Sequence, residues 1–281
     1  MNVIDMRCRP PLPSLLETRL YDIDYATNFA KKFGGSYIAE SAKNRSVPQL
    51  LQEMRQLDIT LGVYEVRWSK TIDANQEALD FYNHYSNRFA IMTATDVTDI
   101  QASLQAIEQY TVHGSFTGVN LEPGNPGLGY NSLFIDDETL SPIYALCQDY
   151  DLPLTVTFGG CAYPDATAYM PHRVENVLCN FPKLRLGLCH GAWPWFKEYG
   201  GLMIKYPNLR IIPDSYIMFT PGYQEYIHAA NYLLSEQLLF GTSYPYHDQQ
   251  RVLDFYLKCG IRQENIEKIL YYNAMDFLKL M

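Results

Sequence analysis

The sequence predicts an α/β fold, and within that class a single-domain (β/α)8 TIM barrel that spans residues 1–281. Short apolar runs alternate with helical patterns eight times, which is typical of parallel strands joined by crossover helices. Many of these runs are continuously apolar, as expected for strands that are buried on both faces. No glycine-rich dinucleotide fingerprint follows the first run, which favours a closed barrel over an open doubly wound sheet.

The expected strands are short apolar runs bounded by turn residues. They cover residues 3–6, 59–65, 89–95, 116–121, 153–157, 184–189, 209–212 and 238–241. The expected helices lie between the strands and carry apolar residues at helical spacing. After a first helix that starts at Ser46, they cover residues 74–86, 100–110, 136–150, 172–179, 195–205, 222–234, 249–259 and 264–278. Ser46 is a typical N-cap, and the proline two residues later suits the first helical turn.

Residues 10–45 are the exception to this alternation, because they lack a clean period. We predict a long loop with short helical pieces after the first strand. A loop of this length in a compact domain is often a functional lid. A second loop, residues 122–127, follows the fourth strand and is rich in proline and glycine, which predicts a rigid turn.

Composition limits the class of protein and the class of partner. The chain is 47% hydrophobic and 19% charged, which is ordinary for a globular domain. Its net charge of -9 argues against nucleic acid or an anionic membrane as the main partner. Six cysteines lie far apart without a C-x-x-C motif, so we expect reduced, buried thiols rather than disulfides or a zinc knuckle.

The N-terminal residues and the lengths of the apolar runs predict where the protein is located. The first ten residues carry charges within their apolar run, and no window approaches the ~20 apolar residues of a spanning helix. We therefore expect a cytoplasmic protein. The aromatic content of 14% is high and suggests an aromatic-lined pocket or a subunit interface, so a homo-oligomer is possible.

Four predicted strand ends carry recognisable motifs. Residues 4–9 read I-D-M-R-C-R, 153–159 read P-L-T-V-T-F-G, 186–191 read L-G-L-C-H-G and 239–245 read L-F-G-T-S-Y-P. In order and spacing they resemble I-D-x-H-x-H, P-V-x-I-H-T-G, L-x-x-x-H-G-G and L-L-F-G-T-D-Y-P, the motifs of the amidohydrolase superfamily in its amidohydrolase-related TIM-barrel branch. Residues 181–186 and 268–274 also resemble the F-P-x-L-x-L and K-I-L-x-x-N-A segments of that branch. The resemblance covers nearly the whole chain and implies a TIM barrel.

The resemblance also implies a divalent metal, but most of the ligand positions differ. In the family, two histidines of strand one, a histidine of strand five and an aspartate of strand eight hold the ion, and the aspartate is the general base. Here these positions are Arg7, Arg9, Thr157 and Ser243, and only His190 of strand six remains. A guanidinium stays protonated and offers no lone pair, and a catalytic zinc needs about three protein ligands. We therefore expect no cofactor.

A rearranged metal site is the alternative to this expectation. It would hold a divalent ion such as zinc with four side chains that follow or end strands, namely Asp5, Glu122, His190 and Asp214.

Arg7 and Arg9 predict an anionic partner. Alternate residues of a strand point the same way, so both side chains should face the barrel interior at its rim. Guanidinium groups bind carboxylates in a bidentate manner, and we expect a small carboxylate substrate. The alternative is that the two arginines form structural ion pairs with barrel carboxylates such as Glu65, Glu122 or Asp214.

Three residues are candidates for acid–base chemistry. His190 ends strand six, and an imidazole titrates near neutral pH, so it could be the general acid or base; the alternative is a hydrogen-bonded core histidine. Asp214 follows strand seven and could orient His190 or act as the base, or simply cap a turn. Glu122 ends strand four and could be an acid or base, or an arginine partner.

Four further residues are candidates for substrate binding: Thr157, Ser243, Tyr244 and Trp193. Each lies at or just past a strand end. No G-x-S-x-G elbow surrounds Ser243, which argues against a nucleophilic serine. For the aromatic pair, ordinary loop packing is an equally good interpretation.

The function expected from these residues is that of an amidohydrolase-like, metal-independent hydrolase that acts on a small carboxylated lactone or ester. Some lactonases of the superfamily work without a metal, and here Asp214, Glu122 or His190 would have to supply the base. Two alternatives stay open. One is a decarboxylase or hydratase of the same branch, and the other is a non-catalytic anion-binding protein.

Overall fold

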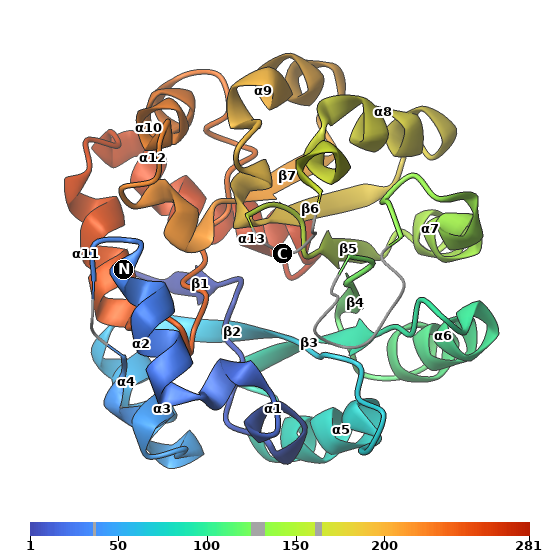
Figure 1. Ribbon diagram of the computed structural model, residues 1–281, viewed down its shortest axis with the longest axis horizontal. Helices are drawn as coiled ribbons and strands as arrows, with labels where there is room; N and C mark the ends of the chain where they lie inside the picture. The colour runs from blue at the N-terminus through green and yellow to red at the C-terminus, as the bar shows by residue number, and fades with distance from the viewer. Residues whose placement is uncertain (36–37, 125–132, 161–164) are drawn as a thin grey trace.

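In the computed structural model, residues 1–35, 38–124, 133–160 and 165–281 are described, and they form a single α/β domain with strands at the centre and helices outside (Figure 1). Within these residues, seven parallel strands follow one another around the sheet in sequence order. They are β1 (Val3–Asp5), β2 (Ile59–Glu65), β3 (Phe89–Ala94), β4 (Gly118–Leu121), β5 (Pro153–Val156), β6 (Arg185–Cys189) and β7 (Leu209–Ile212). The sheet confirms the predicted barrel class, and its strands all end at the same rim.

The eighth predicted strand, residues 238–241, closes the sheet without being a regular strand. On one side, the backbone N–H of Leu239 donates to the carbonyl of Ile211 in β7 at 2.9 Å. On the other side, the N–H of Met6 donates to the carbonyl of Phe240 at 3.0 Å. The segment therefore lies between β7 and β1, as predicted, but the prediction of a regular strand is wrong.

Hydrogen bonds to groups outside the sheet explain why this ladder stays irregular. The N–H of Phe240 donates to the carbonyl of Ile269, and the N–H of Thr242 donates to the carboxylate of Asp5 at 2.9 Å. Asp5 also accepts from the Thr242 hydroxyl at 2.6 Å and from the Gln249 amide at 2.7 Å. The buried Asp5 thus joins β1, the closing segment and helix α11 (Gln249–Lys258).

The outer helices surround the sheet in Figure 1 and match most of the predicted ranges. Besides α11 they are α4 (Val47–Gln56), α5 (Ala74–Tyr85), α6 (Ile100–Ile107), α7 (Ser141–Asp149), α8 (Pro171–Asn180), α9 (Phe196–Lys205), α10 (Tyr223–Asn231), α12 (Gln263–Glu267) and α13 (Asn273–Phe277). Ser46 caps α4 by accepting from the N–H of Gln49, as its sequence predicts.

Two predicted helices are interrupted. A π-helical turn, η8 (Lys268–Tyr272), divides the last one into α12 and α13. The carbonyl of Ile269 in this turn accepts the N–H of Phe240 from the barrel, which accompanies the local departure from α-helical bonding. A second π-helical turn, η2 (Glu108–Val112), ends α6.

The segment 10–45 contains short helical pieces, as predicted: α1 (Pro13–Leu16), η1 (Arg19–Tyr21), α2 (Ile23–Lys31) and α3 (Glu40–Lys43). Side-chain hydrogen bonds attach it to the barrel. Ser14 donates its N–H to Glu77 of α5 at 3.1 Å, and the Tyr21 hydroxyl donates to the carbonyl of Arg9 at 2.7 Å. Its role as a lid stays a prediction.

The barrel interior is filled by apolar side chains below the rim, which leaves chemistry to the strand ends. This inner cluster includes Ile4, Met6, Val63, Ala90, Met92, Cys189, Ile212 and Leu239. The described cysteines are free, as expected, but Cys179 is exposed rather than buried and Cys259 is half-buried. The sixth, Cys161, lies outside the described residues.

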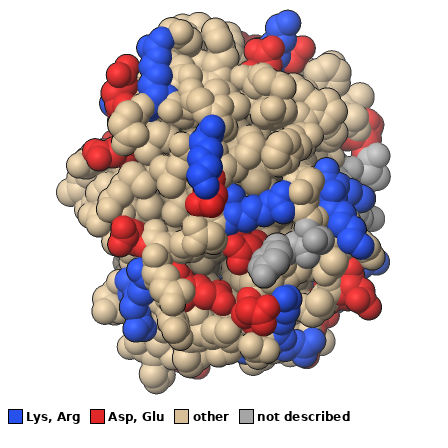
Figure 2. All heavy atoms as spheres, turned by 90° about the vertical axis from the view of Figure 1, so that its left-hand side faces the viewer, with Lys and Arg blue, Asp and Glu red and all other residues tan. Residues whose placement is uncertain are grey.

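Figure 2 views the side of the molecule on which α10, α11 and α12 lie in Figure 1, and most of this face is uncharged. Exposed apolar residues in or beside α10 and α11 include Phe219, Tyr232, Leu233 and Leu257. A homo-oligomer stays a prediction. Within the described part of the chain, no helix has the length and apolar character needed to span a membrane.

Candidate functional site

A cavity of about 570 Å³ opens at the rim where the strands end. Its inner wall comes from Arg7 and Arg9 after β1, Glu122 after β4, Thr157 after β5 and His190 after β6, together with Ser243 of the closing segment. The segment 10–45 and the residues after β2 supply the outer wall. The sequence prediction that the strand ends form one site is therefore reflected in the geometry of the cavity.

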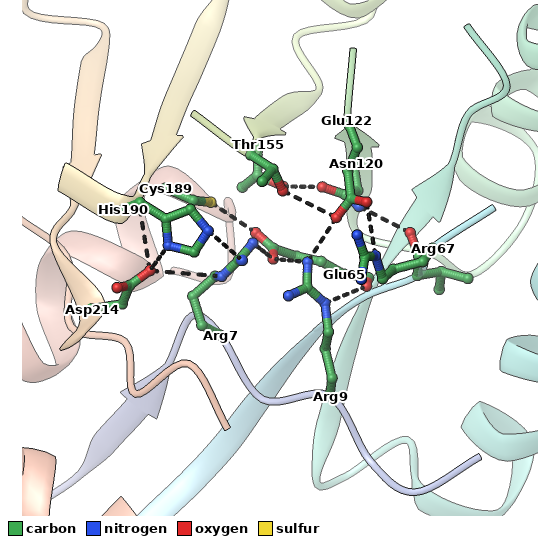
Figure 3. Close-up of polar contacts among 12 residues, drawn as sticks. Arg7, Arg9, Glu65, Arg67, Asn120, Glu122, Thr155, Cys189, His190 and Asp214 are labelled. Carbon is green, nitrogen blue, oxygen red and sulfur yellow. Dashed lines mark hydrogen bonds and ion pairs between the residues drawn. The ribbon is translucent and has the colours of Figure 1, made fainter. Parts of the chain in front are cut away.

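Alternating arginines and glutamates cross the floor of this cavity (Figure 3). Nη1 of Arg7 donates to Oε2 of Glu65. Nη2 of Arg9 donates to the same Oε2 at 3.2 Å and to Oε1 of Glu122 at 2.9 Å. Nε of Arg67 donates to Oε2 of Glu122 at 2.8 Å. The order is thus Arg7, Glu65, Arg9, Glu122, Arg67, which we call the arginine–glutamate chain.

The contacts of the arginine–glutamate chain agree with both interpretations of Arg7 and Arg9. Both arginines form ion pairs with barrel carboxylates, and both also line the cavity. Three guanidinium groups meet only two carboxylates in the arginine–glutamate chain. A third carboxylate, that of Asp214, lies 3.9 Å from Nε of Arg7, so the three positive charges of the site face three negative ones.

His190 and the buried Asp214 form a second polar unit beside Arg7. Nδ1 of His190 lies 2.8 Å from Oδ2 of Asp214, and the backbone N–H of His190 donates to the same oxygen at 3.2 Å. Nε2 of His190 lies 3.4 Å from Nη2 of Arg7. Because a guanidinium can only donate, this contact favours the tautomer with a proton on Nδ1 and a lone pair on Nε2.

Asp214 is ionised in this arrangement. Burial alone would raise the pKa of its carboxyl, but the charge and hydrogen bonds of His190 and the nearby charge of Arg7 outweigh burial and hold the pKa below its usual range. Nε of Arg7 is 3.9 Å from Oδ2 of Asp214. An ionised aspartate on Nδ1 orients the imidazole and holds the proton on Nδ1.

Backbone conformation explains how these side chains reach the rim. His190, Asp214 and Ser243 have positive φ values of 60°, 44° and 58°, which non-glycine residues rarely adopt. Gly191 follows His190 with φ of 66°, and a Cβ at this glycine would lie 2.5 Å from the Tyr226 hydroxyl oxygen. Unfavourable backbone angles at three strand ends are typical of functional sites.

Glu122 has the most acidic carboxyl of the cavity wall. Burial would raise its pKa, but the charges of Arg67, Arg9 and Arg7 and the hydrogen bond from Arg67 lower the pKa to about 2. A glutamate with so low a pKa is ionised at every physiological pH. Glu122 therefore fits the role of arginine partner better than that of general acid.

Acidification is expected to destabilise the fold through Glu122. Its pKa is about 4.3 in an unfolded chain and about 2 in the fold, so its stabilising effect is complete above pH ~4.3 and is lost as the pH falls towards ~2. The pKa difference corresponds to about 3 kcal/mol. Between pH ~6 and pH ~3 about half of this contribution, roughly 1.5–2 kcal/mol, is lost, and urea unfolding at the two pH values measures the loss.

The matched variant for this test is Glu122→Gln, which cannot ionise. Its unfolding free energy is expected to fall less than that of the native chain between the same two pH values. An identical fall in both proteins would contradict the assignment of this pH dependence to Glu122.

The residues at the family's metal positions do not suit a divalent ion in this structure. Nη2 of Arg7 lies 3.4 Å from Nε2 of His190, so the positive charge of Arg7 would repel a divalent ion at that nitrogen. Asp5 is directed away from the cavity, because its carboxylate is used by Thr242 and Gln249. Across the described residues, no group of three or more His, Cys, Asp or Glu side chains is arranged to hold a metal ion. The four-residue alternative site is therefore not assembled.

Thr157 and Ser243 lie in the cavity wall as the sequence suggests. The Thr157 hydroxyl donates to Oε1 of Glu122 at 3.0 Å. The Ser243 side chain is 95% buried, and within the described structure its Oγ has no hydrogen-bond partner. An unsatisfied hydroxyl that faces a cavity suits a ligand or a water molecule.

Tyr244 and Trp193 lie outside the lining of the cavity. Tyr244 is buried behind the wall, and its hydroxyl is 2.8 Å from Oγ of Ser41. The indole N–H of Trp193 donates to the carbonyl of Pro221, and its ring packs against Tyr216 with centroids 5.9 Å apart. Neither residue lines the cavity, whereas Tyr216 does.

Sequence reasoning missed Arg67, which follows β2 by two residues and completes the arginine–glutamate chain. The strand-end rule that selected Arg7 and Arg9 would also have selected Arg67. Sequence reasoning suggested an aromatic-lined pocket but did not identify four of the aromatic side chains in the wall. These side chains are Tyr25, Phe29, Trp68 and Tyr246.

The chain matches the model of the amidohydrolase family over residues 4–280. No curated protein sequence matches the chain. Among solved structures, the uncharacterized TIM-barrel protein Bb4693 from Bordetella bronchiseptica is 32% identical, with a TM-score of 0.89 and 99% of each chain covered.

Two more distant structures share the fold. A dihydroxybenzoic acid decarboxylase from Polaromonas sp. JS666, with bound manganese and 2-nitroresorcinol, is 15% identical with a TM-score of 0.71, covering 100% of this chain and 98% of that one. A 4-oxalomesaconate hydratase from Rhodopseudomonas palustris is 16% identical with a TM-score of 0.66, covering 99% and 95%.

Proposed function

Because the chain belongs to the amidohydrolase family, we propose that it is an enzyme that hydrolyses a small carboxylated lactone or ester without a metal. The observation that carries this proposal is the pairing around His190. Its Nδ1 is 2.8 Å from Asp214, and its Nε2 has Arg7 at 3.4 Å. A candidate general base and a fixed positive charge thus lie side by side at the cavity wall.

The arginine–glutamate chain supports the choice of an anionic substrate. Arg7, Arg9 and Arg67 all line the cavity, whereas of their partners Glu65, Glu122 and Asp214 only Glu122 does. A substrate carboxylate in the cavity would therefore meet more guanidinium than carboxylate groups and would accept hydrogen bonds from them. The decarboxylase and hydratase names of the structural neighbours are consistent with a carboxylate, although at their identities they share only the fold.

Hydrolysis follows from these positions in two steps. First, Nε2 of His190 takes a proton from a water molecule while the water oxygen bonds to the substrate acyl carbon, and the carbonyl oxygen becomes an oxyanion beside Arg7. Second, the tetrahedral intermediate collapses, the bond from the acyl carbon to the leaving oxygen breaks, and His190 returns the proton to that oxygen. The products are a carboxylic acid and an alcohol, joined in one molecule when the substrate is a lactone. Asp214 stabilises the imidazolium between the steps.

Chelator treatment tests the metal-free part of the proposal. We expect a panel of carboxylated lactones and aryl esters to include a substrate whose turnover changes by less than about twofold after dialysis against EDTA, because no step requires an ion. Turnover is measured by pH-indicator release of acid. Loss of turnover on dialysis, with recovery on adding manganese or zinc, would contradict the proposal.

Decarboxylation is the second candidate function. It is favoured by the aromatic residues of the cavity wall, Tyr25, Phe29, Trp68 and Tyr246, which suit a flat ring. Release of CO2 from hydroxybenzoates, without acid release from lactones, would favour this candidate. Absence of turnover on both panels, together with a thermal shift on adding benzoate, would favour a non-catalytic anion-binding protein.

The charge of the protein supports proposals about its location and its partners. We propose a cytoplasmic enzyme whose partner is a small anion and not nucleic acid or a membrane, in line with the net charge of -9. Light scattering of the purified chain would decide whether it forms a homo-oligomer.

A further inference from the structure

The cationic residues of the cavity fall into two groups. The first group, Arg7, Arg9 and Arg67, consists of side chains that pair with glutamates of the barrel, and we call them the inner arginines. The second group is Arg19 in η1 and Lys70 after β2, which are both exposed and line the same cavity. We call these two the outer cations.

Arg19 and Lys70 differ from the inner arginines in their contacts. Within the described residues, neither Arg19 nor Lys70 forms an ion pair with a carboxylate. Arg19 instead lies over the ring of Tyr25, with its guanidinium carbon 5.7 Å from the ring centroid. The inner arginines have part of their charge compensated, whereas the outer cations leave theirs available.

A hydrogen bond joins the two segments that carry the outer cations. The Thr71 hydroxyl donates to Oε2 of Glu17 at 3.0 Å, which joins the segment 10–45 to the loop after β2. Arg19 is two residues from Glu17, and Lys70 is next to Thr71. Glu17 lines the same cavity as Arg19 and Lys70, and its carboxylate accepts this hydrogen bond.

Aromatic side chains complete the same cavity. Tyr25 and Phe29 of α2 line it together with Trp68 and Tyr246. The Phe29 and Tyr246 rings pack with centroids 5.0 Å apart, and Tyr25 lies 6.0 Å from Tyr246. A cavity with buried arginines, an aromatic wall and exposed unpaired cations suits a flat ligand that is charged at two ends.

We propose that Arg19 and Lys70 form a second anion subsite, and that the substrate is an elongated dianion with a flat apolar middle. One anionic group binds the inner arginines, and the other binds the outer cations. This inference deepens the proposed function and rests on it for the role of the inner arginines. It adds a specificity determinant that acts on binding rather than on the chemical step.

Calorimetric titration with matched pairs of non-reacting carboxylates tests the subsite. The pairs are terephthalate with benzoate, and biphenyl-4,4'-dicarboxylate with biphenyl-4-carboxylate. Within at least one pair, the dianion is expected to bind about tenfold more tightly than the monoanion, because two exposed ionic contacts contribute up to about that factor. Raising the ionic strength to ~0.5 M lowers this preference.

The variant for this test is Arg19→Gln/Lys70→Gln, in which the preference for the dianion falls to about twofold or less. The matched control, Arg55→Gln/Lys183→Gln, removes two exposed cations that do not line the cavity and keeps the preference. Equal affinities within both pairs, absence of binding by every dianion, or an unchanged preference in the Arg19→Gln/Lys70→Gln variant would overturn the subsite.

The outcome is separable from that of the proposed function. The probes are not turned over, so failure of the lactone and ester panel leaves the measured binding preference intact. Conversely, equal binding of dianions and monoanions would remove the subsite while leaving metal-free hydrolysis of a monoanionic substrate possible.

Discussion

Replacement of Arg7 by methionine is expected to lower the free energy of unfolding by about 3–5 kcal/mol. Arg7 is almost fully buried, and it pairs with Glu65, whose side chain has no exposure. Its Nε also lies 3.9 Å from the buried Asp214. Methionine fills much of the volume but leaves two carboxylates with less compensating charge, and an uncompensated buried charge is strongly unfavourable. Urea denaturation near neutral pH measures the change.

Two further variants separate loss of charge from loss of packing. Arg7→Met/Glu65→Gln removes the charge on both sides, so it should recover a large part of the lost stability. Arg185→Met is the matched control, because Arg185 pairs with Asp151 at 2.8 Å on the surface, and its loss should cost only about 0–1 kcal/mol. A loss below about 1 kcal/mol in Arg7→Met would show that the arginine–glutamate chain is not a structural element.

The fold could be predicted from the sequence wherever local pattern decides the structure. The predicted ranges 59–65 and 209–212 coincide with β2 and β7, because each is a short, largely apolar run. The closing segment was harder, since its ladder depends on Asp5 and on the carbonyl of Ile269, both far away in sequence. Bonds of this kind leave no trace in the periodicity of the segment itself.

For the candidate site as well, local pattern predicted some positions, whereas contacts between residues distant in sequence determine others. Strand-end position brought Arg7, Arg9 and Ser243 to one cavity, because parallel strands end at one rim. Tyr244 fails by one residue: Ser243, with φ of 58°, faces the cavity, whereas Tyr244 packs towards Ser41. The backbone turn at Ser243 could not be predicted from the sequence. The outer wall could not be predicted either, because the position of the segment 10–45 depends on tertiary contacts such as that of Ser14 with Glu77.

Replacement of His190 by asparagine is expected to lower kcat by about 10²–10⁴-fold on the substrate that the panel identifies, with a smaller change in KM. Asparagine can still hydrogen-bond Asp214 but cannot take a proton through Nε2. The side chain of His190 is 17% exposed, so the variant should fold, as near-ultraviolet circular dichroism can verify. Retention of more than about a tenth of kcat would exclude His190 as the general base.

Asp214→Asn and the double variant show whether the two residues act as one unit. If Asp214 works by orienting the imidazole and stabilising its charged form, the double variant should be about as slow as His190→Asn alone, because effects within one catalytic unit are not additive.

Glu122 is the alternative candidate for the general base. Its pKa of about 2 argues against this role, because a base much weaker than imidazole accelerates proton transfer little near neutral pH. Glu122→Gln should therefore raise KM through the disturbed arginines more than it lowers kcat. A loss of kcat in Glu122→Gln as large as that in His190→Asn would instead place the base at the other end of the cavity floor.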